Sequence, residues 1–323
     1  MKSVYKKKTK ATGGPEVVIE QIVLSVEDIL KQHNSKIEDI EALGIGVPGM
    51  VDENSGVVIS APNLYGWKDI ALKDKMEEIL GIPVIIGNDV NMGLFGEYRF
   101  GVAKDYRNIV GVFVGTGIGG AIIIDGKILT GANNLAGEIG HMVIDRKSNM
   151  QCGCGNYGCI EASAGRLGIV KRIASKIKKG KRSIVSSICK KNMLKLRSGK
   201  LKKAIDAGDE VVSKEVKRAS KEIGIAIANI LNILDPEAVV LGGGVIEALG
   251  DFMLPFIKRS ISQHTVNYGD RKTKILMSIL GDYSTIMGAA SYALEKLILS
   301  GDRHPLDQKN QDLRENQLIL KDQ

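Results

Sequence analysis

The chain is poor in aromatic residues and in cysteine, and it has no long hydrophobic run. Aromatic side chains make up only 4% of the 323 residues, whereas glycine occurs 38 times. This balance favours an α/β enzyme with many tight turns, and a hydrophobic content of 44% suffices for two domains with a large core. No run of about eighteen apolar residues occurs, so we expect no membrane span.

The N-terminus and the cysteine content argue against export. Lys6-Lys7-Lys8 is not followed by the apolar region that a signal peptide requires. The chain has only four cysteines, and three of them lie within one short segment, which does not suggest a disulfide framework. We therefore expect a cytoplasmic protein.

The excess positive charge is concentrated in one segment. The net charge is +8, and residues 171–203 contain fourteen lysines and arginines but no acidic residue. Such a run is compatible with a nucleic-acid patch or with the solvated faces of helices. The segment contains no aromatic residue on which bases could stack, so we favour solvated helices and do not expect a nucleic-acid partner.

Hydrophobic periodicity predicts alternating strands and helices in the first part of the chain. Such alternation builds a mostly parallel sheet with both faces covered. The expected elements are a helix over 17–32, strands over 40–47 and 56–60, a helix over 70–80 closed by Gly81, and a strand over 83–86 that leads into Gly87-Asn88-Asp89 and a further helix.

A second unit is expected from about residue 109 to 284, after a first domain over 1–108. The last helix starts after Ser284-Thr285, either of which could be its N-cap, and we expect it to pack back on the first domain. The tail over 300–323 is polar and is predicted to be disordered. Within the second unit we expect strands over 110–114 and 121–124 around a turn at 115–120, a helix over 211–233, and a strand over 238–241.

A histidine and three cysteines form the most informative motif. His141 is followed by Cys152, Cys154 and Cys159, with glycines between the cysteines that allow tight turns. Thiolate and imidazole ligands suit Zn²⁺, and four protein ligands give a closed, structural site without an open position for water. The alternative is a group of reduced, partly buried thiols.

The same segment resembles the zinc and sugar motif of the ROK family, which groups bacterial sugar kinases with sugar-responsive repressors. Glu138-Ile-Gly-His141 and Cys152-Gly-Cys-Gly-Asn-Tyr-Gly-Cys-Ile-Glu161 keep the family's spacing. The resemblance implies an actin-like, two-domain α/β fold, ATP, Mg²⁺ and a structural Zn²⁺ as cofactors, and a homodimer. It also implies phosphorylation of a hexose, most similar to the glucokinase reaction at the entry to glycolysis.

The resemblance also assigns roles to individual residues. Asp89 would be the general base that takes a proton from the attacking sugar hydroxyl, although an N-cap role at the start of a helix is equally compatible with its position. The residues that would hold the sugar are Asn63, Asn88, Asp89, Glu138, His141 and Glu161. His141 would bind zinc through one ring nitrogen and donate to the sugar through the other.

Two glycine-rich segments are candidates for nucleotide binding. The first is followed by a strand, so it is not a dinucleotide fingerprint, and it resembles the phosphate loop of actin-like ATPases; an ordinary hairpin is the alternative. The second follows a strand and is similar to the family's loop on the adenosine side. The residues are Gly115, Thr116, Gly117, Gly119 and Gly120 in the first segment and Gly242, Gly243 and Gly244 in the second.

One family feature has no counterpart in the 323 residues. ROK kinases begin with a strand, Asp-x-Gly-Gly-Thr and a second strand, a hairpin that binds phosphates and helps place Mg²⁺; here the match starts near Ala11. We therefore expect the fold with this hairpin and a central strand missing, and low activity of this form. The sequence is compatible with a fragment, a misplaced start or an inactive relative. The rival functions are a sugar-binding protein without catalysis and a transcriptional regulator, although only about ten residues precede the match.

Overall fold

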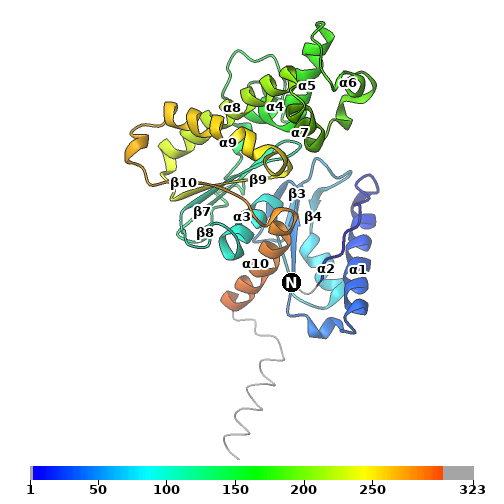
Figure 1. The fold of residues 1–323 in the computed structure, drawn as a ribbon. Helices are drawn as coiled ribbons and strands as arrows, with labels where there is room; N and C mark the ends of the chain where they lie inside the picture. Colours follow the sequence, from blue (N-terminus) through cyan, green and yellow to red (C-terminus); the bar gives the residue numbers. More distant parts are fainter. Residues whose placement is uncertain (1–2, 301–323) are drawn as a thin grey trace, which may run out of the picture. The chain divides into compact units, whose positions relative to one another are not determined.

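The computed structural model describes residues 3–300, and its contacts divide the chain into two compact units (Figure 1). The first unit comprises the chain up to Gly93 together with the chain from Thr285 onward, and the second comprises Leu94–Ser284. The division falls inside helix α3 (Asp89–Phe100), earlier than residue 108. The predicted tail, apart from Ser300, lies outside the described residues.

The first unit contains two small sheets. Strands β1 (Leu43–Val47) and β5 (Val84–Asn88) pair in parallel, with Val47 opposite Asn88 at their carboxyl ends. An antiparallel sheet in the order β2-β3-β4 lies between them in sequence. Its strands are β2 (Met50–Asp52), β3 (Val57–Ser60) and β4 (Lys68–Ile70).

Helices α1 (Gly14–Gln32) and α2 (Leu72–Leu80) belong to the first unit, and α10 (Ser284–Ser300) joins them from the far end of the sequence. Apolar residues of α1 and α2 pack with strand residues in one core. Gly81 ends α2 with φ of 68°, a left-handed conformation that glycine adopts without the steric cost of a Cβ. The helices therefore follow the predicted hydrophobic spacing.

One edge of β1 has no neighbouring strand among the described residues. Within that part of the chain, β1 pairs with β5 alone, so the parallel sheet of the first unit has two strands. A largely apolar groove of about 370 Å³ lies beside it, lined by residues of β1 and α1 and by Tyr5, Lys7 and Thr9. The Trp67 indole N–H at this groove is buried and has no acceptor in the described structure.

The second unit is built on a five-stranded mixed sheet in the order β10-β9-β6-β7-β8. The strands β6, β9 and β10 run parallel, and the β6–β7 and β7–β8 pairs are antiparallel hairpins. The first three strands are almost completely buried or half-buried, as expected for parallel strands covered on both faces. The bounds are β6 (Ile109–Val114), β7 (Ile118–Ile124), β8 (Lys127–Ile128), β9 (Ala238–Gly242) and β10 (Lys274–Met277).

Two long helices, α8 (Glu210–Leu234) and α9 (Gly244–His264), form the main helical layer of the second unit, and they lie side by side (Figure 1). The helix predicted over 211–233 is α8, and its apolar residues pack in the core of the unit. The shorter helices are α4 (Ile160–Ala164), α5 (Arg166–Lys178), α6 (Ser186–Asn192) and α7 (Ser198–Asp206). Within residues 3–300, no helix combines the length and the apolar character that a membrane span needs.

Three predicted boundaries are wrong. Ile70 was expected to open a helix, but it pairs with Val58 and ends β4. Residues 40–42 precede β1 rather than form part of it. Neither predicted N-cap of α10 caps it: the hydroxyls of Ser284 and Thr285 donate to the carbonyl oxygens of Gly281 and Asp89.

Candidate functional site

The histidine and the three cysteines of the predicted zinc motif meet in the second unit. The ligand atoms of His141, Cys152, Cys154 and Cys159 all lie within 4.8 Å of one another. The Cys154 and Cys159 sulfur atoms are 3.8 Å apart, and the Cys152 sulfur lies 3.6 Å from His141 Nδ1. The fold thus brings together four potential ligands that span eighteen positions of the sequence.

The sulfur–sulfur separation of 3.8 Å and the sulfur–nitrogen separation of 3.6 Å match those of a tetrahedral zinc ion. With bonds of about 2.3 Å to sulfur and about 2.05 Å to nitrogen, a regular tetrahedron places two sulfur atoms about 3.8 Å apart and sulfur and nitrogen about 3.5 Å apart. Burial raises the pKa of the Cys152 thiol to about 12, so a neutral thiol is favoured there without a cation. A bound dication reverses this preference because it stabilises thiolates.

The backbone around the cysteines is shaped by short bridges and by glycines. Isolated β-bridges join Val143 to Cys159 and Gln151 to Tyr157. Gly155 and Gly158 have φ of 89° and 82°, values that side-chain-bearing residues rarely adopt. The tight turns predicted for the segment around the three cysteines are present.

His141 presents its two ring nitrogens to different partners. Nδ1 faces Cys152, and Nε2 lies 3.6 Å from Glu138 Oε2, too far for a direct hydrogen bond. The His141 and Glu138 side chains are 35% and 53% exposed, so both are accessible to a ligand. Binding of a metal at Nδ1 would leave the proton on Nε2, where it can be donated.

Glu161 connects the cysteine cluster with the first glycine-rich loop. Its Oε2 accepts a 2.9 Å hydrogen bond from the Ile118 backbone N–H, and its Oε1 lies 3.6 Å from the Cys152 sulfur. Gly117 lies against this carboxylate so closely that a Cβ at that position would overlap it. A larger residue at position 117 would therefore have to displace the Glu161 carboxylate.

The first glycine-rich loop is the β6–β7 hairpin. The carbonyl oxygens of Gly115 and Thr116 accept hydrogen bonds from the start of α5, and Arg166 Nη2 donates to Thr116 Oγ1 at 3.2 Å. The N–H groups of Thr116 and Gly117 donate to no acceptor among residues 3–300. Sequence reasoning missed Arg166, which is buried although nothing in its local pattern marks it.

The predicted turn at 115–120 is too long. Gly119 and Gly120 are strand residues of β7, opposite Phe113 and Val112. Gly120 lacks a Cβ at a point where the Gly137 carbonyl crosses the strand, so this glycine allows a close backbone approach and not a turn.

The second glycine-rich segment joins β9 to α9. Gly242 ends the strand, Gly243 adopts φ of 85°, and Gly244 is the first helical residue. A Cβ on Gly243 would meet the Val114 carbonyl at the end of β6. The two glycine-rich segments are thus neighbours at the carboxyl ends of adjacent parallel strands, where ligands of open α/β sheets bind.

In the first unit, Asn88 is the residue that caps α3. Its Oδ1 accepts hydrogen bonds from the N–H groups of Val90 and Asn91, and its Nδ2 donates to the Gly49 carbonyl. Two of the three polar functions of this side chain are therefore used fully in the fold, and one amide hydrogen is left for a ligand.

Asp89 follows as the first residue of α3, at the carboxyl end of β5. Burial raises the pKa of its carboxyl group, and hydrogen bonding from the Val90 backbone only partly opposes this effect. A raised pKa brings a carboxylate closer to the range in which it exchanges protons readily.

Asn63 lies in the turn between β3 and β4 and is exposed. Gly49, which accepts the hydrogen bond from Asn88, passes so close to Ser60 that only glycine fits there. The start of the β3–β4 turn and the Asn88 side chain are therefore in one neighbourhood of the first unit. The structure describes the candidate residues of each unit separately: Asn63, Asn88 and Asp89 in the first, and Glu138, His141, Glu161 and the glycine-rich segments in the second.

Comparison with known proteins gives the family. The ROK family model matches residues 2–296, so the chain belongs to the ROK family. It is 32% identical to a glucokinase from Halalkalibacterium halodurans over 87% of this chain and 84% of that protein. It is 31% identical to a putative xylose repressor from Caldicellulosiruptor sp. over 89% of this chain and 71% of that protein. Among solved structures, a ROK glucokinase from Streptomyces griseus, in complex with glucose and AMPPNP, matches with a TM-score of 0.74 and 29% identity over 90% of this chain and 91% of that one.

The fold is accordingly that of ROK sugar kinases, the actin-like ATPase fold expected from the sequence motifs. The family contains both enzymes and regulators among the relatives of this chain, and both groups are about equally similar to it.

Proposed function

We propose that the protein transfers the γ-phosphoryl group of ATP to a hexose, most similar to the conversion of glucose to glucose 6-phosphate, with Asp89 as the general base. The observation that carries the proposal is the placement of Asp89 at the mouth of α3 after a parallel strand, with a carboxyl pKa raised by burial. A carboxylate there can accept the proton of a sugar hydroxyl as its oxygen attacks phosphorus.

Each unit offers acceptors and donors that suit the hydroxyl groups of a sugar. Asn63 and the remaining amide hydrogen of Asn88 would contribute from the first unit. Glu138 and Glu161 offer carboxylate oxygens for hydroxyl donors, and His141 Nε2 offers a donor or acceptor depending on its protonation. The Cys152 sulfur lies 3.6 Å from both His141 Nδ1 and Glu161 Oε1, which supports a structural Zn²⁺ that fixes these side chains.

ATP would bind as its magnesium complex at the two glycine-rich segments. The open N–H groups of Thr116 and Gly117 suit phosphate oxygens, and the start of α9 after Gly243 supplies further N–H groups and a positive helix end. Their position at adjacent strand ends supports a single nucleotide site.

A second candidate function is regulation of transcription in response to a sugar, because xylose repressors match this chain as well as glucokinases do. A regulator would use the same sugar-binding residues but would need no general base. A third, sugar binding without phosphoryl transfer, shares them too.

A coupled assay of ADP release with glucose, mannose, fructose and xylose tests the kinase proposal. Sugar-dependent ADP release that is abolished in an Asp89→Asn variant supports it. Sugar binding by calorimetry with no ADP release would contradict it, and a sugar-dependent shift of a DNA fragment in a mobility assay would favour the regulator.

A further inference from the structure

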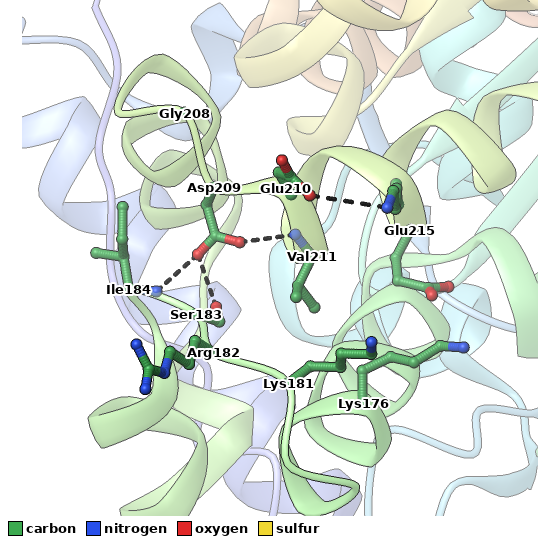
Figure 2. Close-up of a pocket in the computed structure, with 11 residues that line it drawn as sticks. Lys176, Lys181, Arg182, Ser183, Ile184, Gly208, Asp209, Glu210, Val211 and Glu215 are labelled. Atoms are coloured by element: carbon green, nitrogen blue, oxygen red, sulfur yellow. Dashed lines mark hydrogen bonds and ion pairs between the residues drawn. The ribbon is translucent and has the colours of Figure 1, made fainter.

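A second cavity lies in the second unit, apart from the residues assigned above. Its volume is about 820 Å³, and it lies between the end of α5, the loop that follows it and the start of α8 (Figure 2). None of the predicted sugar, nucleotide or zinc residues lines it. The residues that line it include Lys176, Lys181, Arg182, Asp209 and Glu215.

Three cations of the cavity are without a partner. The side chains of Lys176, Lys181 and Arg182 form no ion pair or hydrogen bond with any residue in the described range 3–300. All three belong to the basic segment 171–203, which contains no acidic residue that could pair with them. The lining carries four cationic side chains and the three carboxylates of Asp209, Glu210 and Glu215, a formal excess of one positive charge. Lys214 is paired with Glu210, so Lys176, Lys181 and Arg182 are the cations that an anion could contact.

Asp209, the residue before α8, forms no ion pair with these three cations within residues 3–300. Both Asp209 oxygens are occupied: Oδ2 accepts from Ser183 Oγ and the Ile184 N–H, and Oδ1 accepts from the Val211 and Val212 N–H groups. Asp209 thus caps α8 and holds the loop, as the dashed lines in Figure 2 show. The helix end is closed by this cap, so the anion site is the cavity and not the helix terminus.

Glu215 is the unusual member of the cavity lining. It is only 6% exposed, and its Oε2 is fully enclosed without any hydrogen-bond partner in residues 3–300. In Figure 2 its carboxylate lies on the side toward which Lys176 and Lys181 extend, whereas the Arg182 guanidinium points toward the side of Ile184. A buried carboxylate oxygen without a donor is costly, so this position favours a ligand that brings O–H or N–H groups.

We propose that this cavity binds a small phosphorylated polyhydroxy compound, of the sugar phosphate class. Lys176, Lys181 and Arg182 would hold the phosphate, and Glu215 would accept hydrogen bonds from hydroxyl groups. The volume lies within the range of small-molecule sites, roughly 300–1,000 Å³. No aromatic side chain lines the cavity, so it offers no stacking surface for a nucleotide base.

The proposal is tested by calorimetry on the full chain with glucose 6-phosphate, in the presence of saturating glucose so that the proposed catalytic sugar site is blocked. Lys181→Gln/Arg182→Gln should weaken binding at least tenfold for both glucose 6-phosphate and inorganic phosphate. Glu215→Gln should weaken glucose 6-phosphate by a similar factor and leave inorganic phosphate unchanged.

Lys178→Gln/Lys179→Gln is the matched control, because it removes the same charge from exposed lysines of the same segment that do not line the cavity. Unfolding temperatures of all variants establish that they are folded. Absence of binding under saturating glucose, or equal weakening by the control pair, would overturn the site. Equal affinity for inorganic phosphate and glucose 6-phosphate would overturn the assignment of Glu215 to hydroxyl groups. These outcomes do not depend on the proposed kinase activity, because a protein that releases no ADP can still bind glucose 6-phosphate in this cavity.

Discussion

Removal of the proposed zinc ion from the cysteine cluster should destabilise the second unit, and Cys154 is the residue with which to test it. Cys152 and Cys159 are buried, whereas Cys154 is exposed. Replacing Cys154 by serine therefore removes a ligand with little loss of apolar burial. A change in stability of this variant reports the metal rather than the packing of the thiol.

The size of the effect follows from binding linkage. A ligand present at 100 to 1,000 times its Kd stabilises the folded state by about 2.7–4.1 kcal/mol. For a unit of 150–250 residues, 1 kcal/mol shifts the unfolding temperature by roughly 2–4 °C. Chelation of the wild-type protein, or Cys154→Ser, should thus lower the unfolding temperature by roughly 5–15 °C.

The same perturbation should weaken sugar binding, because His141 Nδ1 and Glu161 both lie beside Cys152. The assays are elemental analysis for one zinc per chain, differential scanning calorimetry with and without a chelator, and titration with glucose. Cys189→Ser is the control, since Cys189 is outside the cluster and should be a free thiol.

The reasoning would be refuted by Cys154→Ser with the wild-type unfolding temperature and unchanged sensitivity to the chelator. Protein without zinc that keeps its full sugar affinity would refute the link from metal to sugar site.

Three further predictions concern single side chains. Asp89→Asn should reduce kcat below a few per cent of wild type and change sugar affinity less than about tenfold. Burial raises the pKa of the Asp89 carboxyl group, so its ionised form is disfavoured in the fold and the variant should unfold at a higher temperature at neutral pH. Wild-type activity should rise as the pH increases through the pKa of Asp89, because the base must be ionised. Gly117→Ala should lower kcat/KM at least tenfold by displacing Glu161, whereas Gly199→Ala, in open surroundings on α7, should leave kcat/KM unchanged and stabilise by up to about 1 kcal/mol; equal kinetics of the two variants would contradict the close approach. Glu97→Gln should cost about 1.5–3 kcal/mol in urea unfolding, because the buried Glu97 carboxylate accepts hydrogen bonds at both oxygens and glutamine keeps one acceptor oxygen; unchanged stability would show that these bonds are dispensable.

Local signals in the sequence were enough for the helices with clear periodicity and for the grouping of His141 with the three cysteines. The helix predicted over 17–32 is α1, and the helix predicted over 211–233 is α8. The fold class followed from motifs of the ROK family, whose model covers residues 2–296. These features depend on residues that are close in the sequence, so they can be predicted from a single sequence.

Side-chain partners far apart in the chain could not be predicted. Tyr292 donates to Glu53 across 239 positions, and Glu97 accepts from Ser278 across 181. No spacing rule links such residues, because only the packing of whole elements brings them together. The same holds for Asn88, whose role as the α3 cap depends on where β5 ends.

The sequence by itself determined the composition of the sites, and the tertiary structure decided their surroundings. The basic run 171–203 was interpreted as solvated helices, but Arg172 is buried against Glu222 at 3.0 Å and three other cations line a cavity with Glu215. Gly119 and Gly120 were interpreted as a turn and are paired strand residues. In each case the residue type limits which interactions the side chain can form. Which of them forms depends on the residues that the tertiary structure places beside it.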